Sequence, residues 1–273
     1  MSNYTELISS TAHASHLAYG FESARIDGYG DDKVVAEAQR LRNYNIPSNM
    51  EYLEDMHDSG TGTSGTVFRN RDTGEIILAY TGTNFQSELL KDGITDFTEV
   101  LTVGGSHYKP AFEFYEHVRA KYGNNIVLTG HSLGGNIAQR VALEYNVPKT
   151  VVYNSAPIYM SGVPVGGTTE RPSLKNKDSV LKERERIDEL EKKYTGETIR
   201  IRSEHDAVSV LRGKHLGKEY VLSDGGFHFM STILDSEVGM EEIEKITKHM
   251  NKNVVTLDVN KDGITDIRLN KLD

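Results

Sequence analysis

The sequence predicts an α/β fold, in which helices flank a mostly parallel sheet. The clearest support is the succession NIVLTG, NIAQRVALEYN and TVVYNSA, which has two buried-strand patterns on either side of a helix pattern. Strand, helix and strand with short links form the crossover that joins parallel strands. The chain has 273 residues, 37% of them hydrophobic, which is enough for one large core of this kind.

Residues 1–57 are predicted to be mostly helical. In KVVAEAQRLRNY the apolar residues share one helical face, namely Val34, Val35, Ala38 and Leu41. After the turn-rich DSGTGTSG, the segments TVFRN and EIILAYTG are predicted to be two short strands of a β-hairpin around RDTG. The segment AFEFYEHVRAKYG is predicted to be a helix that ends at Gly123.

The second half of the chain contains a highly charged segment at 169–196. We expect it to be an exposed helical insert with a thin apolar stripe, made of Leu181, Ile187, Leu190 and Tyr194. A strand, ETIRIRS, and a last helix, EVGMEEIEKITKHMN, are predicted to follow. The main domain would therefore cover residues 1–253, and residues 254–273 would close the chain as a hairpin.

Composition excludes several classes of function. The net charge is −9, with 31 Lys and Arg against 40 Asp and Glu, so a nucleic-acid partner is not expected. Cysteine is absent, which excludes disulfides, a thiolate nucleophile and cysteine-bound metals. The sequence predicts neither a membrane span nor a cleavable signal peptide. Export without a cleavable signal and retention in the cytoplasm both remain open.

The segment LTGHSLGGNI indicates a nucleophile. It places Ser132 in a G-x-S-x-G pattern between a predicted strand and a predicted helix, which is the setting of a nucleophile elbow. The serine sits there on a sharp, strained turn, and Gly130 and Gly134 provide the space that the turn needs. The helix that starts beside the serine favours developing negative charge. Without chemistry, the same pattern would be a glycine-rich strand-to-helix turn.

A nucleophilic serine needs a base and an acid that orients the base. We favour His228 as the base, because it follows a glycine-rich loop and is flanked by two phenylalanines. The alternative base is His215, although nearby basic residues would oppose formation of its imidazolium. Asp206 is the favoured acid, since it follows the strand ETIRIRS, and Glu204 and Asp224 are the alternatives.

With these residues placed, the chain resembles the class 3 lipase family of α/β-hydrolases, and more loosely its phospholipase A1-like bacterial relatives. The segments TGHSLGGNIAQ and GEIILAYTGTN carry the resemblance, and IRSEHDAVSVL supports Asp206 as the acid. The resemblance implies that Thr83 helps to form an oxyanion hole, together with the backbone N–H of Leu133. It further implies a lid over the site that includes Phe85, Leu89 and Leu90, although these residues could equally be ordinary core.

The function implied is hydrolysis of carboxylic esters in acyl lipids by a serine, through an acyl-enzyme and without a cofactor. The expected partners are a lipid or ester substrate and, transiently, a lipid surface. An acyltransferase or a thioesterase would use the same triad. A protein that binds without catalysis on the same scaffold is a further alternative.

The tail LDVNKDGITDIRL has alternating oxygen ligands. Five residues match positions 1, 3, 5, 7 and 9 of a calcium loop, namely Asp258, Asn260, Asp262, Ile264 and Asp266. The bidentate glutamate of an EF-hand is missing, because Leu269 occupies position 12. A structural Ca²⁺ site and a plain hairpin turned by Asn-Lys-Asp-Gly are both compatible with this segment.

Overall fold

The computed structural model describes most of the chain up to residue 222 and short parts of the rest. The described residues are 4–81, 108–160, 174–206, 208–209, 213–222, 230, 234, 244–248, 250 and 266–268.

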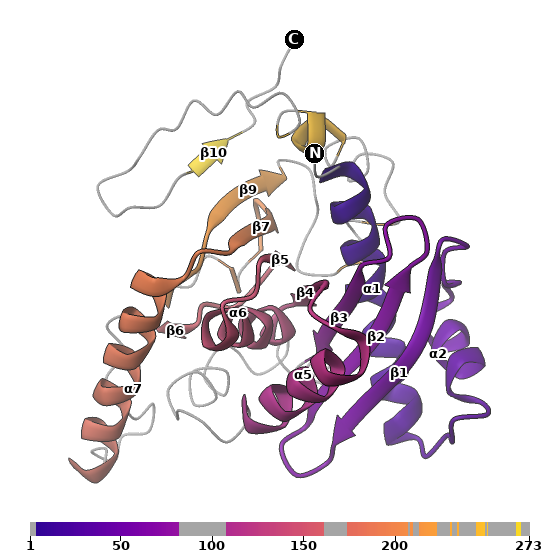
Figure 1. The fold of residues 1–273 in the computed structure, drawn as a ribbon, viewed down its shortest axis with the longest axis horizontal. Helices are drawn as coiled ribbons and strands as arrows, with labels where there is room; N and C mark the ends of the chain where they lie inside the picture. The colour runs from indigo at the N-terminus through magenta and orange to yellow at the C-terminus, as the bar shows by residue number, and fades with distance from the viewer. Residues whose placement is uncertain are drawn as a thin grey trace.

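An eight-stranded sheet forms the centre of the molecule (Figure 1). Its strand order is β1-β2-β3-β4-β5-β7-β9-β10, and a separate two-stranded sheet pairs β6 with β8. The strands are β1 (Met50–Asp58), β2 (Thr63–Asn70), β3 (Ile76–Thr81), β4 (Ile126–His131), β5 (Lys149–Tyr153), β6 (Tyr159–Met160), β7 (Glu197–Ser203), β8 (Gly213–Lys214), β9 (Lys218–Leu222) and β10 (Asp266–Arg268). Pairing is antiparallel from β1 to β3 and parallel from β3 to β10, which confirms the predicted α/β fold.

Helices cover both faces of this sheet. The long helices are α1 (Tyr4–Ile26), α2 (Val34–Arg42), α5 (Tyr108–Tyr122), α6 (Leu133–Tyr145) and α7 (Leu174–Lys193). Strand residues alternate between the two faces: in β3, Leu78 and Tyr80 pack in the cluster that includes α5 and α6, whereas Ile77 and Ala79 pack in the cluster that includes α1 and α2. This period of two is what a strand buried on both sides requires.

Helix α1 differs from an ordinary amphipathic helix, because it buries polar side chains against the strands. Thr11 bonds the Tyr153 hydroxyl at 2.9 Å, and Ser15 bonds Thr129 at 2.8 Å. Further along the helix, Arg25 forms an ion pair with Asp55 of β1 at 2.6 Å. The helix is thus hydrogen-bonded to strands as far apart as β5 and β1.

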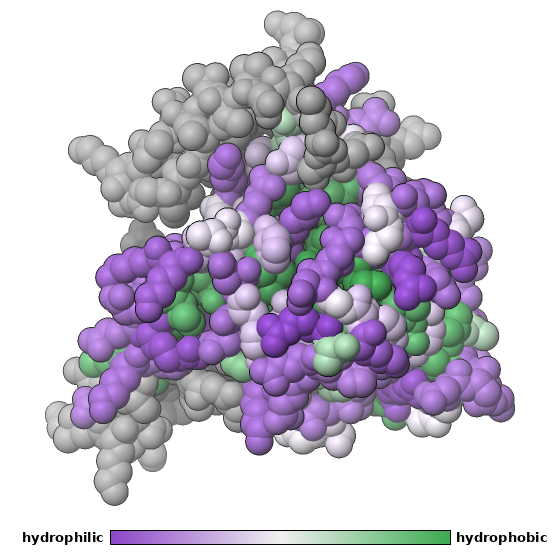
Figure 2. Space-filling model, in the orientation of Figure 1, coloured by the Kyte–Doolittle hydropathy of each residue, from purple (hydrophilic) through white to green (hydrophobic). Residues whose placement is uncertain are grey.

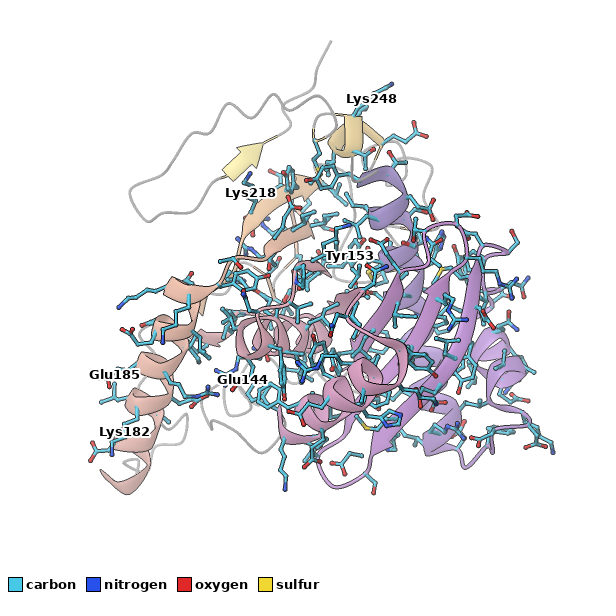
Figure 3. The ribbon with its side chains drawn as sticks, in the orientation of Figure 1. Glu144, Tyr153, Lys182, Glu185, Lys218 and Lys248 are labelled. Carbon is cyan, nitrogen blue, oxygen red and sulfur yellow. The ribbon has the colours of Figure 1, made fainter. Side chains whose placement is uncertain are left out.

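Helix α7 is the charged insert, and it lies on the outside of the molecule as expected. Lys182 and Glu185 point away from the body in Figure 3 and are exposed. Its inner face is held by ion pairs to α6, from Glu183 to Arg140 and from Arg186 to Glu144. Figure 2 shows hydrophilic residues over α7 and hydrophobic ones gathered over the middle of the sheet.

Two local expectations differ from the structure, and a third falls mostly outside the described residues. Residues 50–57, predicted to be helical, lie in β1, where pairing with β2 supplies the backbone hydrogen bonds that a helix would otherwise make. Leu181, expected in the apolar stripe of α7, is 44% exposed, and Val180 is buried instead. At the tail, residues 266–268 pair in parallel with β9, while the rest of the expected hairpin lies outside the described residues.

Candidate active site

The strand-to-helix turn at Ser132 has the geometry that the sequence predicts. β4 ends at His131 and α6 begins at Leu133, so Ser132 alone makes the turn. Its φ of 57° and ψ of −124° are a conformation that residues with a side chain rarely adopt. Strain of this kind persists only where the surroundings enforce it, and it concentrates at functional sites.

Two glycines allow the close backbone contacts on which this turn depends. A Cβ atom on Gly130 would lie 2.4 Å from the carbonyl group of Gly134. A Cβ atom on Gly134 would lie 2.0 Å from the carbonyl oxygen of Tyr80, because the first turn of α6 lies directly against β3. Any side chain at either position would therefore push the helix away from the strands.

The backbone of Ser132 is held from both sides. Its N–H donates to the carbonyl of Tyr153 at 3.1 Å, and its carbonyl accepts from Gly135 and Ala156, both at 3.1 Å. Because Leu133 is the first residue of α6, its N–H is among the helix donors without an intrahelical partner. A preorganised donor thus lies directly after the serine, where an oxyanion can be stabilised.

The buried acid at this edge of the sheet is Asp206. It follows β7, and it is 1% exposed, whereas Glu204 and His205 beside it are exposed. The backbone N–H groups of Ser209 and Val208 donate to its two carboxylate oxygens, at 2.7 and 3.4 Å. These bonds fix the orientation of the carboxylate.

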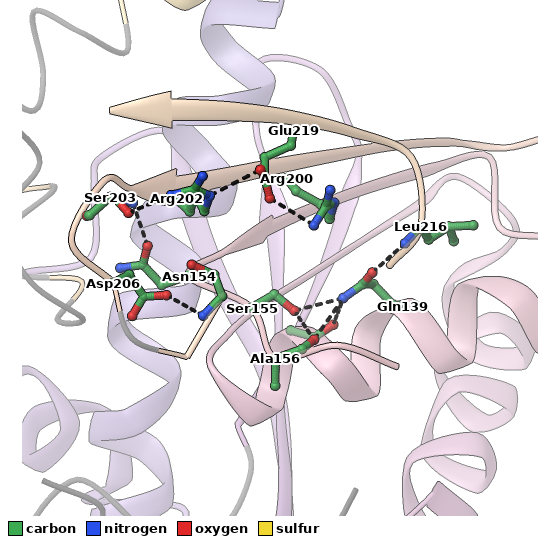
Figure 4. A network of polar contacts seen from close by, with 12 residues as sticks. Gln139, Asn154, Ser155, Ala156, Arg200, Arg202, Ser203, Asp206, Leu216 and Glu219 are labelled. Carbon is green, nitrogen blue, oxygen red and sulfur yellow. Dashed lines mark hydrogen bonds and ion pairs between the residues drawn. The ribbon is translucent and has the colours of Figure 1, made fainter. Parts of the chain in front are cut away.

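Asn154 joins the end of β5 to β7, the strand that leads to Asp206, and sequence reasoning did not single it out (Figure 4). It adopts a φ of 42° directly after β5, and its N–H donates to the carbonyl of Ile201 at 2.9 Å. Its side-chain oxygen accepts from the Ser203 N–H at 2.8 Å. One fully buried amide therefore fixes the ends of β5 and β7 relative to each other.

The alternative base, His215, lies between β8 and β9, at the opposite edge of the sheet from Ser132 and Asp206. It precedes β9, which starts at Lys218 opposite Ile199, and Gly217 packs against Thr198 near the start of β7. Leu216 donates to the side chain of Gln139, two turns into α6. His215 is therefore next to the amino ends of these strands, whereas Ser132 and Asp206 follow the carboxyl ends of β4 and β7.

The preferred base, His228, lies outside the described residues, between the end of β9 at Leu222 and the buried Met230. Several other predicted residues also lie outside them, namely Thr83, Phe85, Leu89, Leu90, Asp258, Asn260, Asp262 and Ile264. Asp266 is the first residue of β10. Among the described residues there is no group of three or more side chains suited to a metal ion, and the expected calcium loop is not among them. No described helix combines the length and apolarity of a membrane span.

Comparisons with known proteins show the family of this chain. The model of the Tle-like phospholipase domain, a phospholipase-like family, matches residues 10–173, a segment that contains the elbow. The chain belongs to this family. The mostly parallel sheet with helices on both faces and the strand-to-helix elbow at Ser132 are features of the α/β-hydrolase fold.

The individual proteins that are similar to this chain share little sequence identity with it. The extracellular phospholipase A1 of Serratia liquefaciens is 27% identical over 103 residues, which cover 38% of this chain and 30% of that protein. Lipase II of Rhizopus niveus is similar in structure, with a TM-score of 0.45 and 16% identity over 82% of this chain and 83% of the lipase. The triacylglyceride lipase of Rhizomucor miehei has a TM-score of 0.47 and 17% identity, covering 80% of this chain and 81% of its own.

Proposed function

We propose that this protein is a serine-dependent carboxylic ester hydrolase that acts on acyl lipids. The observation that carries the proposal is Ser132, a strained residue at the tip of a strand-to-helix elbow, in a chain that belongs to a phospholipase-like family. Backbone strain is costly, and a plain turn at this position could use glycine instead. A nucleophilic role of its hydroxyl explains why a serine occupies this position.

In the mechanism we propose, Ser132 attacks the ester carbonyl while His228 takes its proton. Asp206 holds the tautomer of the imidazole and stabilises its charged form. The tetrahedral oxyanion accepts hydrogen bonds from the Leu133 N–H and from Thr83. The alcohol leaves with the proton from His228, and water then hydrolyses the acyl-enzyme by the same steps in reverse order.

Chain connectivity supports His228 rather than His215 as the base. β7 and β9 are parallel, with Ser203 opposite Leu222, so β9 ends at the edge of the sheet where Asp206 lies, and His228 follows that end by six residues in the sequence. The Glu204 N–H donates to the Leu222 carbonyl at 2.9 Å, which joins the two chain segments at that edge. In parallel α/β sheets the reactive groups gather at the carboxyl ends of the strands.

The decisive experiment follows labelling and turnover of Ser132→Ala. We expect a fluorophosphonate probe to label the wild-type protein at Ser132, and the variant to lose both labelling and hydrolysis of a p-nitrophenyl ester. Ser15→Ala is the matched control, because it removes another buried serine hydroxyl. Labelling and turnover that persist in Ser132→Ala would refute the proposal.

Two further measurements define the base and the products. His228→Ala should reduce turnover to nearly the level of Ser132→Ala, because triad members act as a unit, and His215→Ala should retain most activity. The reverse pattern would assign the base to His215. Mass spectrometry of a phospholipid and triacylglycerol panel would identify the acyl lipid that is cleaved. Transfer of the acyl group to an added alcohol would indicate an acyltransferase. Cleavage of a thioester substrate would indicate a thioesterase.

A further inference from the structure

One turn of α1 contacts the carboxyl ends of β3 and β4, which are neighbours in the sheet. Tyr19 donates its hydroxyl to the carbonyl of His131 at 3.1 Å and lies 3.0 Å from the Nδ1 atom of the same residue. Three residues later, the Glu22 Oε1 atom accepts from the Thr81 hydroxyl at 3.1 Å. His131 directly precedes the nucleophile, and Thr81 is the last residue of β3.

Glu22 also bridges two strands. Ser64 and Thr81 are partners across the β2–β3 ladder, and both hydroxyls donate to the same Oε1 atom at 3.1 Å. The Ser64 hydroxyl is also 2.8 Å from the Nδ1 atom of His57. A single carboxyl oxygen thereby ties the last residue of β3 to both α1 and β2.

This carboxyl group is costly to bury. Glu22 is 2% exposed, and no described cation forms an ion pair with it. Burial raises its pKa to about 7, and the two hydroxyl donors oppose that rise only in part. An apolar residue would pack in this place without the desolvation cost, so the contact with Thr81 calls for a function.

We propose that Glu22 is a positioning residue, which fixes Thr81 at the end of β3, the strand that leads to Thr83 of the proposed oxyanion hole. The inference rests on the proposed function, since the oxyanion hole belongs to it. After Thr81, the chain reaches Thr83 in two residues. Glu22 touches no reacting atom in this scheme and acts only through Thr81.

Precision at the end of β3 matters because an oxyanion donor works over a narrow range of distances. Donors stabilise the intermediate at about 2.7–3.1 Å, and loss of one donor lowers turnover by about 10²–10³-fold. A misplacement of about 1 Å can cost about 100-fold. Thr81 needs a side-chain tether more than a mid-strand residue does, because Ser64–Thr81 is the terminal pair of the β2–β3 ladder.

Ser15 provides a matched control on the same helix. Its hydroxyl bonds Thr129, as Glu22 bonds Thr81, and the contact is equally buried. However, Thr129 is paired on both sides, with Ala79 of β3 and with Val151 of β5. Loss of the Ser15 hydroxyl should therefore lower stability without moving the backbone of the site.

The experiment compares kcat and KM for a short-chain p-nitrophenyl ester in Glu22→Ala, Glu22→Gln, Thr81→Val and Ser15→Ala. We expect Glu22→Ala and Thr81→Val to lower kcat at least about tenfold with KM within about twofold, and their combination to be no worse than either alone. Glu22→Gln should stay within about threefold of wild type, because its amide oxygen accepts the same bonds. Ser15→Ala should leave kcat unchanged.

Unchanged kcat in both Glu22→Ala and Thr81→Val would overturn the proposal, as would a Gln variant that is as impaired as the Ala variant. If Glu22→Ala does not fold, Thr81→Val decides, because it is nearly isosteric and keeps the strand intact. Ser132→Ala is measured in parallel. An active Ser132→Ala would refute the proposed function itself, whereas an inactive one beside fully active Glu22 and Thr81 variants would refute only the positioning role.

Discussion

Helices α1 and α7 are similar in length, with 23 and 20 residues, but they are stabilised in opposite ways. α1 is buried among the strands, and several of its polar side chains form hydrogen bonds to them. α7 lies outside and pairs its charges with those of α6 and with its own neighbours. The difference shows that polar residues in a helix can either determine where strands lie or keep a helix soluble on a surface, depending on burial.

The energetic reason is desolvation. A polar group that is buried without a partner costs about 1–3 kcal/mol, so every bond in α1 constrains geometry strongly. Exposed ion pairs such as those of α7 contribute about 0–1 kcal/mol, because water competes with each partner. We therefore expect substitutions in α1 to alter stability or turnover, and most substitutions on the outer face of α7 to alter neither.

The largest expected contrast is between two leucines, one in each helix. Leu17 in α1 is fully buried, and Leu181 in α7 is 44% exposed. Leu17→Ala should lower the free energy of unfolding by about 2–5 kcal/mol, because it leaves a cavity. Leu181→Ala should change it by less than about 0.5 kcal/mol. Urea denaturation measures both, and comparable losses would abolish the distinction between the helices.

A second test uses the pH dependence of stability. The pKa of Glu22 rises from 4.5 to about 7 on folding, so the native state binds more protons between these values and its stability falls as pH rises through this window. The penalty at pH 8 is about 3 kcal/mol, and Glu22→Gln should be free of it.

Burial lowers the pKa of His13 and of His16, so both side chains make the free energy of unfolding rise with pH. The wild type and Glu22→Gln share this contribution. The difference in unfolding free energy between Glu22→Gln and wild type should therefore grow from pH 5 to pH 8. A constant difference would mean that Glu22 ionises normally in the folded protein.

A third test concerns the inner face of α7. Arg140 of α6 pairs with Glu183, and the guanidinium group lies 4.6 Å from the centroid of the Tyr108 ring. The Arg140 side chain is 5% exposed and that of Glu183 is 27% exposed, so water can solvate the carboxylate once the arginine is lost. Arg140→Met should cost about 1–2 kcal/mol of stability and leave kcat unchanged. A large loss of turnover would show that α7 also shapes the active site.

The smallest effect is expected on the outer face of α7. Lys192 and Glu189 pair at 2.6 Å, but their side chains are 68% and 62% exposed. Lys192→Ala should change the melting temperature by about 1 °C or less, since water competes with both partners of an exposed pair. A shift of several degrees that disappears in high salt would contradict this expectation.

The sequence by itself determined the features that depend on neighbouring residues. The elbow is one of them, because the strand, the serine between two glycines and the helix follow one another within about 20 residues. The β2–β3 hairpin and the end of α5 before Gly123 are others, and Gly123 has the φ of 90° that a helix end favours. In each case a local backbone requirement selects the residue, so the pattern is visible in the chain.

Tertiary structure alone decided the features that join distant segments. Residues 50–57 are predicted from the sequence to be helical, and pairing with β2 makes them a strand. The sequence favours Asp206 as the acid but leaves Glu204 as an alternative, and burial distinguishes the two. The contacts of α1 bridge 59 residues from Glu22 to Thr81 and 142 from Thr11 to Tyr153. A hydrogen bond between distant segments depends on how the whole chain packs, and hydroxyl and carboxyl groups leave no periodic pattern that announces it.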